Sequence, residues 1–317
     1  MHARLDTVYS LLQKQNTMTR KFAGKWSTIA AGRTCIPRMF LALGLTVFAP
    51  LAAASGGKLL ETAGVTQVEG SGGGGLVPWA ILSGYDTREE WSLQTYFSKL
   101  SLDDFRMQSY GASLSAYDRV EISLSEQLLD LRTITADERE IRQQTFGVKA
   151  RVFGDFVYGD WPQISVGLQH KTLADGLIAG ALGAQDDNSG TDVYVAMARA
   201  HLGAVGGYNG FWNLTLRGTK ANQFGLLGFG GDDNNSYEVM AEVAAGVLFS
   251  RQLAAGIEYR QKPDNLSAVK EDDTYNVFLA YFPNKNLNLT LAWVVLGDVA
   301  GAPDQDGLYV SLTGYLW

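Results

Sequence analysis

Residues 287–295 read Leu-Asn-Leu-Thr-Leu-Ala-Trp-Val-Val, and this stretch decides the fold class. Apolar side chains alternate in it with Asn288, Thr290 and Ala292. An alternation of period two is typical of a β-strand with one apolar and one wetter face. The final run, residues 308–317, alternates less clearly and ends in Trp317. The sequence leaves open which face of that last strand meets lipid.

The same alternation recurs about a dozen times along the chain. Clear rows lie at residues 91–99, 108–116, 119–128, 146–155, 163–171, 212–217, 237–247, 253–260 and 275–281. The mean hydropathy is −0.04, which is too low for a bundle of membrane helices. It suits a transmembrane barrel, where every second residue is polar. It also suits a soluble β-sandwich, so composition leaves both classes open.

Loop lengths and aromatic positions favour the barrel. Short links at 86–89, 117–119, 158–162, 250–252 and 283–286 alternate with long ones at 132–141, 174–190, 222–235, 263–272 and 297–306. Outer-membrane barrels have short periplasmic turns and longer outer loops. Aromatic residues occupy row ends, as interfacial girdles require: Trp91, Trp212, Tyr237, Tyr259, Tyr275 and Tyr281. The sequence therefore predicts an all-β, up-and-down antiparallel transmembrane β-barrel in the bacterial outer membrane.

The strand count follows from parity. Residues 76–317 hold about thirteen rows, whereas bacterial single-chain barrels have an even number of strands. The first row runs into a short turn, so another strand must precede it, and Leu59–Val68 is the candidate. We therefore predict 14 strands, with 12 as the alternative if Leu59–Val68 and a weak strand drop out. Gly70–Gly75, which lies between Leu59–Val68 and the row that begins at Leu76, is expected to be a flexible loop.

Residues 1–54 have the pattern of a secretory signal peptide. Seven basic residues precede an apolar run, Met39–Leu51, and the small residues Ala52–Ala54 follow. The run is shorter than the roughly 20 apolar residues of a spanning helix, and Pro50 interrupts its end. We expect cleavage after Ala54 and a barrel formed by residues 55–317. The long basic region leaves Met1 and Met18 as alternative starts.

The expected mature chain is acidic and lacks cysteine. Cys35, the one cysteine, lies in the signal segment. Removing that segment takes away seven basic residues and one acidic residue, which moves the net charge from −7 to −13. An acidic surface argues against nucleic acid as a partner. Without disulfides, we expect a closed ladder of backbone hydrogen bonds to supply the stability.

Several motifs carry a family resemblance. The first group lies at 56–60 (Gly-Gly-Lys-Leu-Leu), 64–70 (Gly-Val-Thr-Gln-Val-Glu-Gly) and 74–80 (Gly-Gly-Leu-Val-Pro-Trp-Ala). The second lies at 102–106 (Leu-Asp-Asp-Phe-Arg), 109–111 (Ser-Tyr-Gly) and 117–121 (Tyr-Asp-Arg-Val-Glu). Together they resemble a family of bacterial exported proteins catalogued as domain of unknown function 3034. The resemblance covers nearly all of the expected mature chain and implies an outer-membrane-type barrel. It transfers no catalytic or binding residue.

The sequence gives no pattern for catalysis or metal binding. His170 and His201 are the histidines of the expected mature chain, and no carboxylates lie at ligand spacing from them. Ser165 is the serine nearest to His170 but points to the opposite face, so a serine–histidine esterase is not expected. The acidic loops at 186–187, 232–233 and 271–273 lack the spacing of a dedicated calcium loop. We expect no enzyme activity, no cofactor and no metal.

The candidate site consists of charged residues expected on the inner face. These lumen-lining residues are Glu121, Lys149, Arg151, Asp155, Lys171, Arg217, Glu238, Glu242, Glu258 and Arg260. In a wide lumen such charges would line water and select ions, whereas in a narrow one they would form a paired polar filling. The bases Lys149, Arg151 and Lys171 lie on adjacent rows, and the acids at 238, 242 and 258 lie on a later pair. We interpret this as opposed charge across the lumen.

Two functions remain open from the sequence. The first is a passive channel or small-solute transporter, and the alternative is a structural or assembly-related barrel with a side-chain-filled lumen. The expected partners are the lipid bilayer and the outer-membrane assembly machinery, the latter through the C-terminal strand that ends in Trp317. The sequence does not identify a solute.

Overall fold

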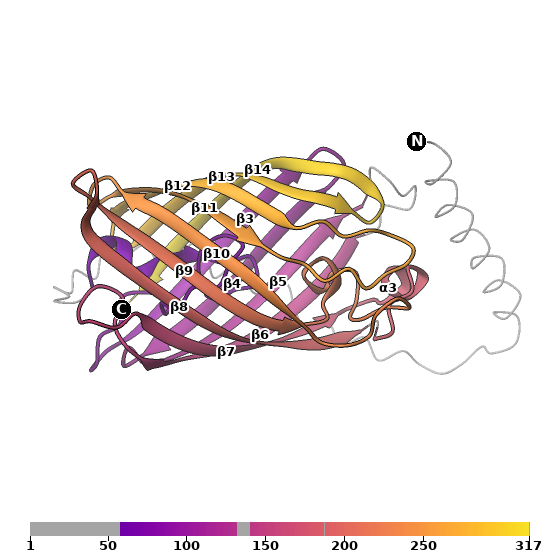
Figure 1. Ribbon diagram of the computed structural model, residues 1–317, viewed down its shortest axis with the longest axis horizontal. Coiled ribbons are helices and arrows are strands. Elements are labelled where there is room, and N and C mark those ends of the chain that lie inside the picture. The colour runs from indigo at the N-terminus through magenta and orange to yellow at the C-terminus, as the bar shows by residue number, and fades with distance from the viewer. Residues whose placement is uncertain (1–57, 132–139, 187, 317) are drawn as a thin grey trace, which may run out of the picture. The chain divides into compact units, whose positions relative to one another are not determined.

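The computed structural model describes residues 58–131, 140–186 and 188–316. The expected signal segment, residues 1–54, and Trp317 lie outside these ranges. Twelve strands of the described chain form a closed antiparallel barrel (Figure 1). They are β3 (Trp91–Leu102), β4 (Arg106–Ala116), β5 (Val120–Asp130), β6 (Glu140–Phe153), β7 (Gln163–Leu173), β8 (Ser189–Val205), β9 (Tyr208–Thr219), β10 (Glu238–Leu248), β11 (Leu253–Arg260), β12 (Thr274–Asn284), β13 (Leu287–Val299) and β14 (Ala302–Leu316).

Pairing of the first and last wall strands closes the barrel. Each strand pairs with its neighbours in sequence, and β14 pairs with β3 from Gly307↔Leu102 to Leu316↔Leu93. Closure leaves no strand edge, so the ladder satisfies the backbone polar groups of the wall. None of the described helices is long and apolar enough to cross a membrane.

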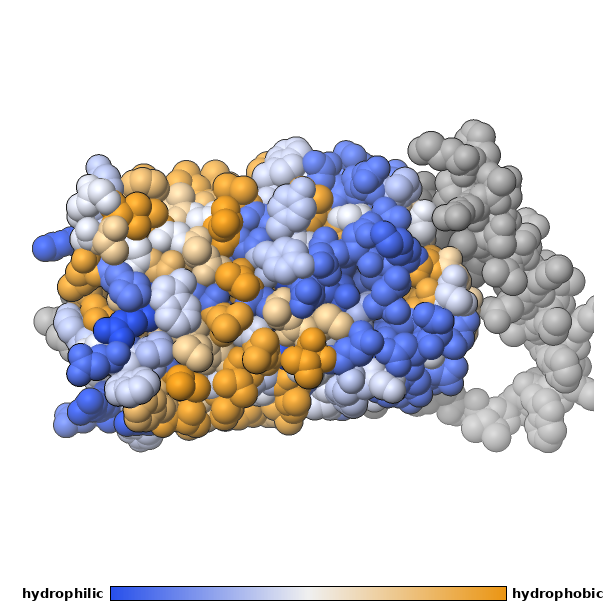
Figure 2. All heavy atoms as spheres, in the orientation of Figure 1, coloured by the Kyte–Doolittle hydropathy of each residue, from blue (hydrophilic) through white to orange (hydrophobic). Residues whose placement is uncertain are grey.

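The outer face of the wall is apolar. Ile122, Leu279 and Leu291 point outward and are exposed, whereas the residues beside them in the chain point inward and are buried. Apolar side chains gather over the middle of the surface in Figure 2, and hydrophilic ones gather toward the end that carries α3 (Leu177–Ala181). In water such a surface would be unstable, whereas in hydrocarbon it is the expected lining. The protein is an outer-membrane β-barrel.

Aromatic residues ring both ends of the apolar band. Trp91 and Tyr281 lie exposed at the end with the short turns, and Tyr237 and Tyr275 lie exposed at the end with the long loops. Their amphipathic rings suit the two membrane–water interfaces. In the last strand, β14, Leu308 and every second residue from it point outward toward lipid. Tyr309 and every second residue from it point into the barrel.

The 14-strand prediction is wrong, and the alternative count of 12 is confirmed. Leu59–Val68 is not a wall strand: it contains the 3-10 helix η1 (Leu60–Ala63) and the two-residue strand β1 (Val65–Thr66). The row that begins at Leu76 is not a wall strand either. Residues 63–86 are all buried, whereas a wall strand exposes every second residue. Both segments lie inside the barrel.

One expected long loop is also absent from the wall. Residues 297–306 belong to β13 and β14, which pair as far as Val299↔Ala302 and turn through Ala300 and Gly301. Both turn residues have positive φ, 51° and 85°. Residues 297–306 therefore lengthen β13 and β14 beyond the apolar band instead of forming a loop.

A charge at the middle of the outer face should test the lipid exposure of the wall. Replacing Leu279 by Arg should destabilise the folded barrel by about 2–4 kcal/mol, because the charge would face hydrocarbon. Reversible urea unfolding in lipid vesicles measures this change. Leu177→Arg in the exposed helix α3 is the control and should have little effect. Equal stability of the two variants would contradict a lipid-facing Leu279.

Candidate functional site

The lumen contains the N-terminal part of the described chain, residues 58–86, which we call the inner hairpin. Its strands β1 and β2 (Gly72–Gly73) pair with each other through Val65↔Gly73 and Thr66↔Gly72. The chain then returns along the lumen to β3. Every residue from Ala63 to Asp86 is buried. The hairpin therefore fills the space that an open pore would leave to water.

Side chains of the wall bind the peptide groups of the inner hairpin. The carbonyl of Val68 accepts hydrogen bonds from Tyr96 Oη (3.2 Å) and Gln127 Nε2 (3.0 Å). The carbonyl of Ala80 accepts one from Gln163 Nε2 (2.7 Å). Glu121 accepts hydrogen bonds from the backbone N–H groups of Gly72 (3.0 Å) and Ser83 (2.7 Å). Because no ladder with a wall strand satisfies these groups in the described residues, the wall side chains do so.

Glycines allow the two arms of the inner hairpin to pack closely. A Cβ added to Gly72 would lie 2.6 Å from the backbone nitrogen of Ser83. A Cβ on Gly74 would overlap the Glu258 carboxylate. Gly70–Gly75 is therefore a closely packed segment, and the expectation of a flexible loop is wrong.

Small inward residues make room for the inner hairpin. Many buried inward positions of the wall are serine or alanine: Ser92, Ser98, Ser109, Ser113, Ser115, Ser123, Ser125, Ala196, Ala198, Ala244, Ala254, Ala280 and Ala292. A barrel filled only by its own side chains would need larger residues here. The wall and the hairpin thus complement each other in volume.

Seven of the ten charged residues singled out from the sequence are buried inside the barrel: Glu121, Lys149, Lys171, Arg217, Glu242, Glu258 and Arg260. Lys149 pairs with Glu121 at 3.3 Å and donates hydrogen bonds to the carbonyls of Gly72 (2.6 Å) and Ile81 (2.8 Å). Glu258 accepts hydrogen bonds from the Leu76 N–H and from Asn276 Nδ2.

The other three charged residues lie at the rims. Arg151 pairs with Asp155 (2.8 Å) and with Asp118 at the end with the short turns. Glu238 accepts a hydrogen bond from Asn234 Nδ2 (2.8 Å) at the opposite end. These side chains are only partly buried.

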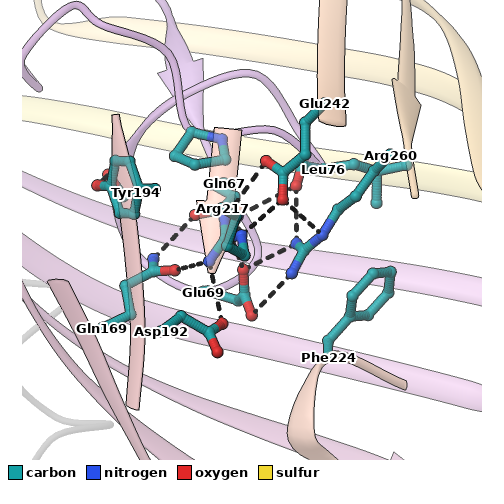
Figure 3. A network of polar contacts seen from close by, with 12 residues as sticks. Gln67, Glu69, Leu76, Gln169, Asp192, Tyr194, Arg217, Phe224, Glu242 and Arg260 are labelled. Carbon is teal, nitrogen blue, oxygen red and sulfur yellow. Dashed lines mark hydrogen bonds and ion pairs between the residues drawn. The ribbon is translucent and has the colours of Figure 1, made fainter. Parts of the chain in front are cut away.

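A dense ionic cluster surrounds Glu69, at the tip of the inner hairpin (Figure 3). Its carboxylate contacts three cations of the wall: Lys171, Arg260 (2.8 Å) and Arg217 (3.9 Å). We call Lys171, Arg217 and Arg260 the cation trio. Two wall carboxylates share the trio: Asp192 pairs with Lys171 (2.7 Å) and Arg217 (3.1 Å), and Glu242 pairs with Arg217 (2.5 Å) and Arg260 (3.2 Å).

This pairing contradicts the interpretation of opposed charge across the lumen. Glu242 contacts two members of the cation trio, so the acids and bases neutralise each other locally. Sequence reasoning missed Glu69 because its segment was assigned to the wall and a flexible loop. It also missed Asp192, whose alternation with the buried Tyr194 is a signal for an inward position.

A loop closes the lumen at the end with the long loops. It contains η2 (Asn222–Gly225), and residues 221–231 are all buried. The Phe224 carbonyl accepts a hydrogen bond from Lys171 (3.0 Å), and its ring lies 4.3 Å from the Arg260 guanidinium carbon. Gln223 and Phe224 have φ of 43° and 64°, a left-handed conformation that is unfavourable for these residues.

Little free volume remains beside the inner hairpin. An apolar cavity lined by Trp79, Phe211, Phe278 and Phe282 offers about 20 Å³ to the centre of a water molecule. That is room for about one water. Together with the burial of every residue from Ala63 to Asp86, this small cavity shows that the hairpin occupies the lumen beside it.

His170 and His201 lie on the outer face, away from this cluster. His170 Nδ1 is 2.8 Å from Thr191 Oγ1, and His201 Nε2 accepts a hydrogen bond from Trp212 Nε1 at 3.0 Å. His170 thus contacts a threonine and not Ser165, which is buried inside. The described residues contain no group of three or more metal-ligating side chains.

Glu271 lies buried in the loop between β11 and β12. Its carboxylate pairs with Lys262, whose Nζ is 3.7 Å away. Burial raises the pKa of Glu271 to about 7, partly offset by the charge of Lys262. The protonated form therefore favours the packed loop.

The chain is similar to one described family of sequences and to several solved structures. Residues 62–313 match a family described as "Protein of unknown function (DUF3034)". No curated protein matches. Among solved structures, the chain is similar to the KdgM porin in complex with disordered oligogalacturonate (11% identity, 70% of this chain, 98% of that chain, TM-score 0.43). It is also similar to the NanC porin (9% identity, 71% of this chain, 100% of that chain, TM-score 0.45). A third similar structure is an outer membrane channel from Pseudomonas putida F1 (12% identity, 72% of this chain, 96% of that chain, TM-score 0.42).

Packing of the loop around Glu271 should depend on pH. An unfolded glutamate has a pKa of 4.5, so the stability that the raised pKa provides is complete below pH 4.5 and is lost as pH rises through about 7. Hydrogen exchange of residues 261–273, corrected for intrinsic rates, should accelerate over this range. Glu271→Gln should remove the dependence, and an unchanged profile in that variant would show that another group is responsible.

Proposed function

The chain belongs to the family DUF3034, and we propose that it is an outer-membrane channel for small polar solutes whose lumen is closed by its own inner hairpin. The observation that carries this proposal is the chemistry of the wall beneath the hairpin. Each of the twelve wall strands contributes at least one buried polar side chain to the interior. Such a wall would be hydrated as soon as the hairpin moved away.

A barrel that is permanently filled would be at least as stable with apolar side chains on the inner face of its wall. Buried ion pairs add little net stability compared with apolar packing, because both charges must be desolvated. The ionic cluster around Glu69 and the pair Lys149–Glu121 are therefore better suited to a lumen that is alternately filled and wet. This supports the channel over the alternative, a structural or assembly-related barrel with a filled lumen.

The attachment of the inner hairpin also suits a movable plug. Its ladder is internal, since β1 pairs with β2 and with no wall strand among the described residues. Both ends of the hairpin lie at the end with the short turns, where Lys58 pairs with Asp86 (3.1 Å) and Asp118 (3.0 Å). The hairpin can therefore leave toward the periplasm without opening any strand pair of the wall.

Two further proposals complete this picture. We infer that residues 1–54 are a signal peptide and that residues 55–317 form the mature barrel. We also infer that the outer-membrane assembly machinery recognises the C-terminal strand that ends in Trp317. Both Trp317 and the signal segment lie outside the described residues.

Matched glycine variants test the channel. Gly72→Ala would place a Cβ 2.6 Å from the Ser83 nitrogen, whereas Gly75→Ala would make only ordinary contacts, the nearest at 3.5 Å from the Tyr309 ring. Overpacking costs about 1–3 kcal/mol, so Gly72→Ala should raise the open probability about tenfold or more in single-channel recordings. Wild type and Gly75→Ala should stay mostly closed.

The recordings also separate the two functions. Folding of each variant is checked first by its heat-dependent mobility on a denaturing gel. If folded Gly72→Ala remains as non-conducting as Gly75→Ala, the channel proposal fails and the filled structural barrel is favoured.

A further inference from the structure

We propose that the cation trio, Lys171, Arg217 and Arg260, is a binding site for the carboxylate of a small organic acid, and that Glu69 occupies it in the closed state. This proposal rests on the channel function, because a solute reaches the trio only when the inner hairpin moves. It adds the chemical class of the solute and the means by which the solute favours opening.

The trio converges from three strands on one carboxylate. Lys171 comes from β7, Arg217 from β9 and Arg260 from β11, and all three side chains are buried. Lys171 contacts Oε1 of Glu69, Arg217 contacts Oε2, and Arg260 donates to both oxygens. The wall therefore supplies cations to both oxygens of a planar carboxylate, and the hairpin supplies the carboxylate.

Charge balance requires an anion at this position. Without Glu69, the trio faces two wall carboxylates, Asp192 and Glu242, so one positive charge is left uncompensated. An unpaired charge in a buried site is strongly unfavourable. The excess of a single positive charge matches a monoanion, whereas a dianion such as sulfate would leave one buried negative charge uncompensated.

Neutral donors and acceptors extend the site beyond the ion pairs. Arg217 Nη1 donates to Gln169 Oε1 (2.7 Å), and Gln169 Nε2 donates to Gln67 Oε1 (3.0 Å). Gln67 leaves with the hairpin, which would free the amide of Gln169 on the wall. A polar solute with hydroxyl groups beside its carboxylate would satisfy this amide.

The loop above the trio is built as a second cover. Phe224 lies over Arg260, and its carbonyl accepts a hydrogen bond from Lys171, so the loop and the hairpin tip bind the same cations. Gln223 and Phe224 adopt left-handed φ values, and such strain persists where the surroundings hold it in place. Removal of Glu69 would weaken the contacts that hold this loop.

Competition between Glu69 and a free acid couples binding to opening. A tethered carboxylate has an effective concentration of about millimolar or higher, so the closed state resists low solute concentrations. An acid that binds the trio excludes Glu69 and so shifts the hairpin toward the displaced state. Any change that displaces the hairpin therefore increases the apparent affinity for the acid, up to the affinity of the fully displaced state.

Direct binding measurements test the site independently of conductance. Full-length wild type and Glu69→Gln, folded in detergent micelles, are titrated calorimetrically with gluconate, with glucose as the neutral analogue and with sulfate. Glu69→Gln should bind gluconate about tenfold or more tightly than wild type, because the amide competes less for the cations. Neither protein should bind glucose.

Two controls isolate the trio. Glu61→Gln removes another carboxylate of the inner hairpin, one that contacts no member of the trio in the described contacts, and should leave gluconate binding as weak as in wild type. Lys171→Met added to Glu69→Gln should weaken binding at least about tenfold. If Glu69→Gln fails to fold, Gly72→Ala keeps Glu69 but displaces the hairpin and should also bind gluconate.

The outcomes are distinct for the two proposals. Absence of gluconate binding in the folded variants, or sulfate binding as tight as gluconate binding, overturns the carboxylate site even if Gly72→Ala conducts. Gluconate binding that depends on Lys171 supports the site, even if none of the variants conducts and the channel proposal fails.

Discussion

Hydrogen bonding of peptide groups in a place without water is the constraint on which the rest of this structure depends. The wall meets it by closing β14 onto β3, so that no strand edge faces hydrocarbon. The inner hairpin meets it differently, because its peptide groups are bound by side chains of the wall such as Glu121, Lys149 and Gln163. The wall is thus a permanent ladder, and the hairpin is held by side chains that can exchange it for water.

The cluster around Glu69 gives this arrangement its specificity. One carboxylate at the tip contacts cations from three strands, and two fixed carboxylates of the wall nearly balance those cations. Because of this balance, the Glu69 carboxylate neutralises the cation trio in the closed state, and another carboxylate could take its place. A solute that carries one carboxylate offers the same charge, which is why closure and recognition are proposed to use the same residues.

Much of the wall was predictable because its signal is local. The alternation at residues 119–128 placed Ile122 outward and Glu121 inward, and both positions agree with the structure. The inward position of Lys171, Arg217 and Arg260 followed from the same rule. Their shared partner did not, because Glu69 lies about 100 or more residues away in sequence, and no periodicity links it to them.

The sequence by itself determined the class of fold, the membrane, the outward face of each clear row and the inward charges, since a period of two records which solvent each side chain meets. Only the tertiary structure decided that residues 58–86 turn into the lumen, which lowered the strand count to 12 and filled the pore. The physical reason is that the inner hairpin is buried on all sides from Ala63 to Asp86. A segment surrounded by protein has no wet face, so the apolar row at Leu59–Val68 resembled a lipid-facing strand, and the packing glycines resembled a flexible loop.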